Sequence, residues 1–497
     1  MGTHRPRAHR GALALLATTP LVALIGVSAP ATAVTPAAPI PNGPVATVAG
    51  PLTGGGGINL VAARATELDD SWVREEYTIE GDAVSYTMNG EYPADGMLAL
   101  AEGESGTYRT RIVVIRPVDP AAFNGTVVVE WLNVSSGFDA SPDYTYLGDE
   151  LIRGGAAWVG VSAQRIGIEG GPVAVTTPVS EGIGAGKGIK ALDPERYGDL
   201  NHPGDAFSHD IFTQVARTLR TPGQVDPLAG LVPERVIAAG ESQSAFMLTT
   251  YVNGVHPLTH VFDGFFIHSR GGGAAPLGEP DAGLDVVRSI TGPTTTIRVD
   301  NDVPVVVLES ETDVLGLLNF YRARQPDNDH LRIWEIAGTA HADLYQVGPV
   351  AELMGCPAPI NAGGQHFVAK AALRHLDAWI RTGTAPPSAQ PLEVAGTPPV
   401  FVRDENGNAL GGIRTPHVDV PVDTLSGEAA EGGAVICLLF GSTTPLSGDR
   451  LAELYASPED YLAQFEAATD AAIEAGFILP EDRDAALADA QPDRITG

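Results

Sequence analysis

A serine in this sequence occupies the tip of a predicted strand-to-helix turn. The apolar run 235–239 leads into the pentapeptide GESQS at 240–244, and a helix-like stretch follows it. Strand and helix approach closely at such a turn, so the places two before and two after the serine need small side chains. Gly240 and Ser244 meet that need, although glycine is the usual residue at the second place. The spacing therefore predicts Ser242 as a nucleophile.

A serine nucleophile needs a histidine base and an acid that orients the base, and at this kind of turn the chain order is serine, acid, histidine. The apolar run 303–308 is typical of a buried parallel strand, and Glu309, Glu311 and Asp313 follow it. The acid usually lies a few residues past the end of its strand. We therefore predict Asp313 as the acid, with Glu311 as the alternative.

A histidine follows the next strand-like run. Residues 331–336 have the pattern of a last core strand, and the loop after them presents His341. Small residues ahead of His341 allow this loop to fold back over the carboxyl edge of the sheet. His268, which ends another strand-like run, is the alternative, but it precedes the acid in the chain. Ser242, Asp313 and His341 are thus the predicted set for nucleophilic acyl transfer.

Two backbone N–H groups are expected to stabilise the negative oxygen that such an attack produces. One is the amide of Gln243, directly after the serine, and the other belongs to the loop after the third predicted strand. That loop covers residues 133–137, so Val134 or a neighbour is the predicted second donor. Each such donor typically contributes about 2.7–4 kcal/mol of transition-state stabilisation. The loop lacks the HGGG signature, and a plain polar turn is the alternative.

The elements that must position these residues alternate along the chain. Alternation of strands with helices is typical of an α/β fold with a mostly parallel sheet covered by helices on both faces. Ligands in such sheets bind at the carboxyl ends of the strands, where the three predicted residues all fall. The strand-like runs cover 108–115, 126–132, 156–161, 235–239, 265–267, 303–308 and 331–336, and the clearest helical patterns cover 207–219 and 365–380.

Two insertions and a C-terminal extension are expected around this sheet. Residues 164–205 and 271–302 are rich in Gly and Pro or too long for ordinary connections, so they are candidates for the rim of a substrate pocket. In the extension, Ser457 and Gly476 frame one helix with a single apolar stripe, which must pack on something. The predicted organisation is a signal peptide at 1–33, a lead with the first strands at 34–105, the α/β core at 106–385 and an extension packed on the core at 386–497.

The sequence contains two cysteines, Cys356 and Cys437. A lone pair of cysteines in an exported chain is expected to form a disulfide. This disulfide would tie the extension to the core, and two buried free thiols are the alternative. Neither cysteine has the histidine and cysteine neighbours of a zinc site, so we predicted no metal and no cofactor.

The beginning of the chain has the pattern of a secretory signal peptide. Three arginines lie within the first ten residues, an apolar stretch covers 11–27, and an Ala-x-Ala cleavage site ends at Ala33. We expect cleavage near Ala33 and an extracellular product. No later apolar run has the length of a membrane span. The net charge of −31 argues against nucleic acid or an anionic membrane as a partner.

Four motifs together resemble those of a family of large exported bacterial proteins called alpha/beta hydrolase domain proteins. The resemblance extends over most of the chain after the signal. It implies an α/β-hydrolase fold and a serine hydrolase whose triad is Ser242, Asp313 and His341, but it implies no substrate. The motifs are GESQSA at 240–245, DPERY at 193–197, ETD at 311–313 and the segment 408–416.

These observations lead to one predicted function and two alternatives. The predicted function is hydrolysis of a small-molecule or polymeric carboxylic ester through an acyl-enzyme. The first alternative is a secreted serine peptidase or amidase, in which a poorer leaving group demands stronger acid catalysis by His341. The second is a catalytically silent binding protein that keeps the hydrolase scaffold.

Overall fold

The computed structural model describes residues 1–2, 43–62, 66–178, 180 and 182–495. The chain forms two units, Met1–Ala38 and Pro39–Gly497, and the fold below is that of the second unit. The predicted signal peptide, with its cleavage site near Ala33, lies outside the described residues apart from the first two. Among the helices that are described, none combines the length and the hydrophobicity of a bilayer span.

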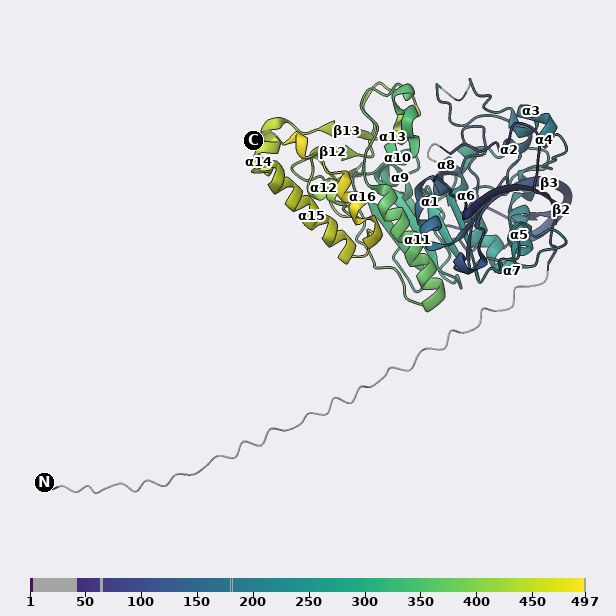
Figure 1. Cartoon of the computed structure of the whole chain (residues 1–497), viewed down its shortest axis with the longest axis horizontal. Helices are drawn as coiled ribbons and strands as arrows, with labels where there is room; N and C mark the ends of the chain where they lie inside the picture. Colours follow the sequence, from purple (N-terminus) through teal and green to yellow (C-terminus); the bar gives the residue numbers. More distant parts are fainter. Residues whose placement is uncertain (3–42, 63–65, 179, 181, 496–497) are drawn as a thin grey trace. The chain divides into compact units, whose positions relative to one another are not determined.

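A nine-stranded sheet with the order β1-β2-β3-β5-β4-β6-β7-β8-β9 organises this unit (Figure 1). Strands β4 to β9 are mutually parallel, while β1, β2 and β3 are joined to them by antiparallel pairing. The sheet is thus mostly parallel, as predicted. Its strands are β1 (Thr47–Ala49), β2 (Trp72–Thr87), β3 (Ala101–Pro117), β4 (Thr126–Trp131), β5 (Ala157–Val161), β6 (Arg235–Glu241), β7 (Gly264–His268), β8 (Val305–Ser310) and β9 (Leu331–Ile336).

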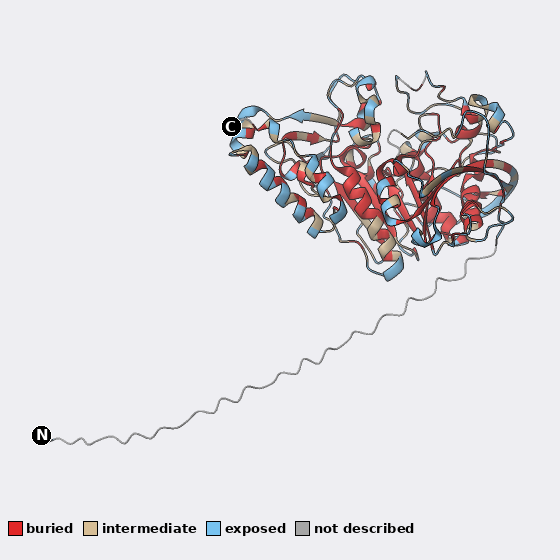
Figure 2. Cartoon of the chain, in the orientation of Figure 1, coloured by how far each residue is buried: buried red, intermediate tan, exposed pale blue. Residues whose placement is uncertain are grey.

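Helices bury both faces of the sheet. Along β4, Val127 and Val129 belong to one apolar cluster and Val128 to another, because successive side chains of a strand point to opposite faces. The first cluster includes residues of α5 (Ser208–Arg220) and α6 (Gln243–Thr250), and the second includes residues of α1 (Pro142–Gly154) and α11 (Gln365–Thr382). Figure 2 shows the central strands and the first half of α11 in the colour of buried residues. Burial on both faces explains why the parallel strands are continuous apolar runs.

The long antiparallel pair of β2 and β3 was only partly predicted: first strands were expected within residues 34–105 without bounds, and residues 108–115 were predicted as one strand. Charged residues that look solvent-exposed in the sequence are buried here in ion pairs. Arg111 of β3 lies 2.5 Å from Glu76 of β2 and 2.9 Å from Asp139, and all three side chains are fully buried. Such pairing allows a strand to carry charge in the interior.

Shorter helices decorate the connections between strands. The π-helical turn Tyr251–Val255 continues α6 directly into α7, so that one helical rod leads from the nucleophile turn toward the opposite edge of the sheet. The short helices before the C-terminal extension are α2 (Arg165–Glu169), α3 (Gly188–Leu192), α4 (Pro194–Tyr197), α7 (His256–Thr259), α8 (Val286–Thr291), α9 (Glu311–Leu315) and α10 (Leu344–Val347).

The C-terminal residues form small hairpins and helices beside α11 (Figure 1). The predicted amphipathic helix is α15 (Pro458–Glu474), whose cap is the Ser457 side chain and whose end is followed by Gly476 at φ +82°. The other elements are β10 (Val394–Ala395), β11 (Val400–Phe401), β12 (Asp423–Ser426), β13 (Ser442–Pro445), α12 (Pro416–Asp419), α13 (Cys437–Phe440), α14 (Gly448–Leu454) and α16 (Arg483–Ala488).

The apolar stripe of α15 has two partners. Tyr461 and Phe465 join a cluster made by the extension itself, whereas Ala472 near the end of the helix joins a cluster that includes Phe367 of α11. Asp482 adds a buried ion pair, 2.8 Å from Lys370 of α11. The C-terminal segment therefore contacts the helix layer, and the domain boundary at residue 386 stays a prediction.

Candidate active site

The turn between β6 and α6 has a strained backbone at its tip. Ser242 has φ +60° and ψ −120°, a conformation that non-glycine residues seldom adopt and that is often found at functional sites. The turn also needs the small residues that the sequence predicted. A Cβ atom on Gly240 would lie only 3.0 Å from the Cβ of Ser244 and 3.0 Å from a methyl of Leu248. Close packing of strand and helix therefore favours glycine at position 240.

The three residues predicted from chain order meet at the carboxyl edge of the sheet. His341 Nε2 lies 2.8 Å from Ser242 Oγ, and His341 Nδ1 lies 2.6 Å from Asp313 Oδ1. Both distances are within hydrogen-bond range. Asp313 and His341 are buried, while Ser242 is partly exposed. The arrangement can remove a proton from the serine hydroxyl and stabilise the resulting imidazolium.

Asp313 is fixed by a set of donors. Its Oδ2 accepts hydrogen bonds from the Ser269 hydroxyl at 2.8 Å and from the amide and hydroxyl of Ser310, each at 2.7 Å. Ser310 also caps α9, so the carboxylate is part of a capping box. Burial opposes the charged form of Asp313, but the charge and hydrogen bond of His341, with those of Ser310, keep its pKa below the ordinary value. The carboxylate is thus ionised and fixed in orientation.

Glu311, the alternative acid, points elsewhere. Its carboxylate accepts hydrogen bonds from the amides of Gly338, at 2.6 Å, and Gly427, at 3.1 Å, and lies 3.5 Å from Arg403. Gly338 belongs to the loop that carries His341, and Gly427 lies in the C-terminal segment. Glu311 therefore joins three parts of the chain around the site and makes no hydrogen bond to the histidine.

His268, the alternative histidine, has other partners too. Its Nδ1 lies 2.9 Å from Asp143 and its Nε2 lies 3.1 Å from the amide nitrogen of Gln365. Both ring nitrogens are therefore occupied within a buried polar group behind the site. His268, the last residue of β7, thus connects this strand to α1 through Asp143 and to α11 through Gln365.

The two residues predicted to donate to the oxyanion, Gln243 and Val134, are in contact through the side chain of Gln243. Gln243 is the first residue of α6, so its amide has no acceptor within the helix. The amide of Val134 approaches the side-chain oxygen of Gln243 at 3.4 Å, a long hydrogen bond. Asn133 holds the loop against the turn, because its side-chain amide donates to the carbonyl of Glu241 at 3.0 Å.

A second carboxylate lies beside the serine, and the sequence analysis gave it no role. Glu241 Oε1 is 3.6 Å from His341 Nε2, and the Glu241 side chain is almost fully buried. Burial raises the pKa of Glu241 to about 7, against the opposing charges of His341 and His268. Burial lowers the pKa of His341, but the charges of Asp313 and Glu241 outweigh it and raise that pKa to about 9. Glu241 directly precedes the nucleophile in the chain, and this position was the one sequence signal that could have identified it.

A cavity of about 210 Å³ opens onto Ser242 and His341. This is smaller than the roughly 300–1,000 Å³ of pockets that hold drug-sized ligands. Part of its wall comes from segments distant in sequence, including Val175 of the 164–205 insertion and the residues around α13. The apolar lining residues are Val61, Ala62, Ala140, Pro142, Val175, Ala342, Ile436, Leu439 and Phe440.

A disulfide fixes the C-terminal part of this wall. Cys356 and Cys437 are bonded, as predicted, and Cys437 begins α13. The amide of Ala342, the residue after the histidine, donates to the carbonyl of Leu439 at 3.0 Å. The same segment therefore lines the cavity and contacts the loop that carries His341.

The chain is similar to one protein family and to several solved structures. The sequence profile of a family described as "Alpha/beta hydrolase domain" matches residues 48–488. No curated protein matches the sequence. Among solved structures, the chain is similar to a protein provisionally named a dienelactone hydrolase from Klebsiella pneumoniae, at 13% identity, covering 61% of this chain and 99% of that chain with a TM-score of 0.30. A glucuronoyl esterase from Solibacter usitatus has 10% identity, covers 59% and 81%, and has a TM-score of 0.29.

Proposed function

We propose that this chain, which belongs to the alpha/beta hydrolase domain family, is a secreted serine esterase that cleaves carboxylic esters through an acyl-enzyme. The observation that carries the proposal is the continuous hydrogen-bonded line from Ser242 Oγ through His341 to Asp313, at 2.8 and 2.6 Å. A serine hydroxyl becomes a useful nucleophile when a base of this kind lies within hydrogen-bond reach and is itself oriented by an acid.

In the first half of the proposed reaction, Ser242 Oγ attacks the ester carbonyl while His341 Nε2 takes the hydroxyl proton. Asp313 stabilises the imidazolium, and the amides of Gln243 and Val134 receive the oxyanion. Collapse of the tetrahedral intermediate breaks the bond to the alcohol, which takes the proton from His341 and leaves. Water then attacks the acyl-serine by the same steps, releasing the acid and restoring Ser242.

The cavity supports a small substrate with an apolar acyl group. Its wall beside Ser242 contains Leu439, Phe440 and Val175, and its size suits a short chain better than a long one. Burial of such a group from water contributes about 0.8 kcal/mol per methylene. We therefore expect acetate to hexanoate esters to be better substrates than laurate or longer esters.

The experiment uses the exported protein and a fluorophosphonate probe, which labels an activated serine covalently. Labelling and hydrolysis of p-nitrophenyl acetate should disappear in Ser242→Ala, with at least a 1,000-fold loss of kcat/KM. Ser244→Ala is the matched control, because this buried serine stands two residues away and its hydroxyl has no hydrogen-bond partner among the described residues. A folded Ser242→Ala protein within tenfold of the wild-type rate would refute the nucleophile. Faster turnover of a peptide anilide than of the ester would instead assign the enzyme to the amidases.

A further inference from the structure

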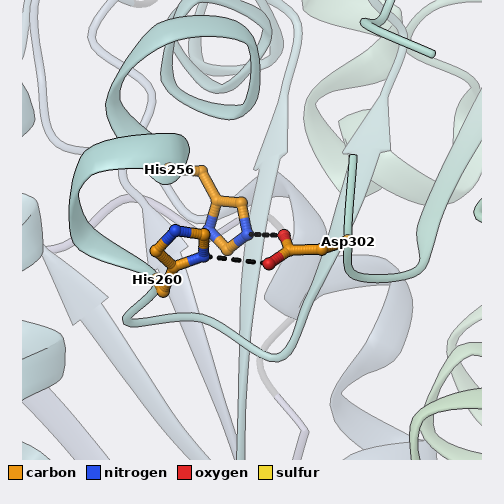
Figure 3. A group of neighbouring side chains, drawn as sticks. All are labelled: His256, His260 and Asp302. Carbon is orange, nitrogen blue, oxygen red and sulfur yellow. Dashed lines mark hydrogen bonds and ion pairs between the residues drawn. The ribbon is translucent and has the colours of Figure 1, made fainter. Parts of the chain in front are cut away.

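Two imidazoles and a carboxylate converge at the edge of the sheet opposite to Ser242. His256 begins α7 and His260 follows it, both before β7, while Asp302 lies in the loop before β8. The parallel strands begin at this edge and end at the active site. Figure 3 shows both rings pointing at the one carboxylate.

The distances join all three side chains. His256 Nε2 is 2.9 Å from Asp302 Oδ1, and His260 Nδ1 is 3.0 Å from Asp302 Oδ2. One donor atom from each residue lies within 4.8 Å of the other two. Donor atoms bound to one Zn²⁺ at 2.0–2.1 Å in tetrahedral geometry are about 3.3 Å apart, so the widest pair would have to close by up to about 1.5 Å, through rotation of the two exposed side chains, His260 and Asp302.

The two histidines are four residues apart, His256 in the first position of α7 and His260 directly after its end. Residues four apart in a helix lie on the same face, one turn from each other. The neighbours of the two cysteines predicted no metal, whereas the His-x₃-His spacing at 256–260 is a signal apart from the cysteines. Imidazole nitrogen with carboxylate oxygen suits Zn²⁺ and related transition metals better than Ca²⁺ or Mg²⁺.

The backbone of His260 is an independent observation. This residue has φ +43° and ψ +37°, the left-handed conformation that helix ends usually give to glycine. Its amide donates to the carbonyl of His256 at 2.8 Å. The left-handed turn brings the ring of His260 back beside that of His256, with 5.2 Å between the ring centroids. Histidine is one of the few non-glycine residues that adopt this conformation readily, and the backbone here leaves the two rings side by side.

The group is open to solvent on one side. His256 is buried, whereas the side chains of His260 and Asp302 are 41% and 56% exposed. The neighbouring Arg298 is paired with Asp300 at 2.6 Å. An ion could therefore enter from solvent and complete its coordination with water.

We propose that His256, His260 and Asp302 bind one Zn²⁺ ion per chain. The ion replaces the protons that the two imidazoles share with Asp302, because both rings must be neutral to act as ligands. It would link the end of the helical rod that starts at Ser242 to the segment that enters β8. Its effect is on stability, because the site lies at the edge of the sheet away from the ester chemistry.

The test is calorimetric titration of ZnCl₂ into the exported, tag-free protein after removal of metals with EDTA. We expect one Zn²⁺ per chain, with a melting temperature raised by about 2–5 °C at a hundredfold excess over Kd. His260→Asn removes the imidazole while tolerating the left-handed backbone, and Asp302→Asn keeps the side-chain shape on an exposed loop. Both should lose the binding and the shift, while ester hydrolysis without zinc stays as in the wild type.

His330→Asn is the matched control, since this half-buried histidine lies outside the group and should leave zinc binding unchanged. Failure of the wild type to bind Zn²⁺ below about 100 μM, or equal binding by Asp302→Asn, would overturn the proposal. Circular dichroism identifies any variant that does not fold, and Asp302→Asn decides alone if His260→Asn is such a case. Because the measurement is binding, its outcome is independent of whether the protein hydrolyses esters.

Discussion

Replacing Glu241 by Gln should shift the pH dependence of ester hydrolysis toward lower pH. His341 acts as a base only when it is neutral, so kcat/KM rises with pH through the pKa of this residue in the free enzyme. The pKa of about 9 is 2.5 above the ordinary value of 6.5. This difference corresponds to about 3.4 kcal/mol favouring the imidazolium, mainly from Asp313 and Glu241.

The contribution of Glu241 to the raised pKa of His341 follows from the distance between the two side chains and from the pKa of Glu241 itself. Its oxygen lies 3.6 Å from Nε2, whereas Asp313 is closer and hydrogen-bonded. With a pKa of about 7, Glu241 is charged in the range where His341 loses its proton. We assign to Glu241 about one unit of the rise in the pKa of His341. The substitution Glu241→Gln should therefore lower the apparent pKa of kcat/KM from about 9 to about 8. At pH 7 Glu241 is itself about half protonated, so the neutral fraction of His341 there rises only about twofold.

A base with a lower pKa is also a weaker base, which offsets this gain. We therefore expect kcat/KM at pH 7 to change by about twofold or less and kcat/KM on the alkaline plateau to decrease about threefold. The assay is a profile of kcat/KM for p-nitrophenyl butyrate from pH 6 to 10, with folded Ser242→Ala as the blank for spontaneous hydrolysis. Glu241→Asp retains the charge and serves as the control. An apparent pKa in Glu241→Gln that is equal to or above the wild-type value would refute the reasoning.

Three further outcomes are expected. Asp313→Asn should lower kcat/KM by about 10³- to 10⁴-fold, because the imidazole loses its orienting partner, whereas Glu311→Gln should mainly lower the melting temperature. If steady-state kinetics gave the reverse ranking, the acid would be Glu311. Reduction of the bond between Cys356 and Cys437, which are 81 residues apart, should destabilise the fold by up to about 4.5 kcal/mol in chemical denaturation, and two alkylated cysteines in the active, unreduced protein would contradict this. Leu439→Trp should fill part of the cavity and lower kcat/KM for hexanoate esters at least tenfold more than for acetate, and an unchanged ratio would show that the acyl group binds elsewhere.

Much of the fold could be predicted because its parallel strands have a simple physical signature. Strands buried on both faces are continuous apolar runs, and the α/β-hydrolase fold expected from the motifs is confirmed by the sheet order and by the family match. The turn at Ser242 was recognisable for a similar reason, since close packing there favours glycine at 240.

What the sequence could not reveal depends on pairing across long distances. Glu76 and Arg111 look like surface residues until β2 and β3 bring them together, which is why most of that hairpin was missed. The neighbouring carboxylates Glu311 and Asp313 differ only in which way each side chain points. The part of the cavity wall at Leu439 is held beside the site by a disulfide and by contacts between segments about 100 residues apart.

The hydrogen bonds of Glu311 have a consequence for any attempt to shorten this protein. A variant ending near residue 385 would lack both Arg403 and Gly427, leaving the buried carboxylate with the amide of Gly338. The unpaired negative charge would then lie directly against the loop that carries His341. A minimal enzyme is therefore not reached by deletion alone; it would also require an uncharged residue at 311 that fills the same volume.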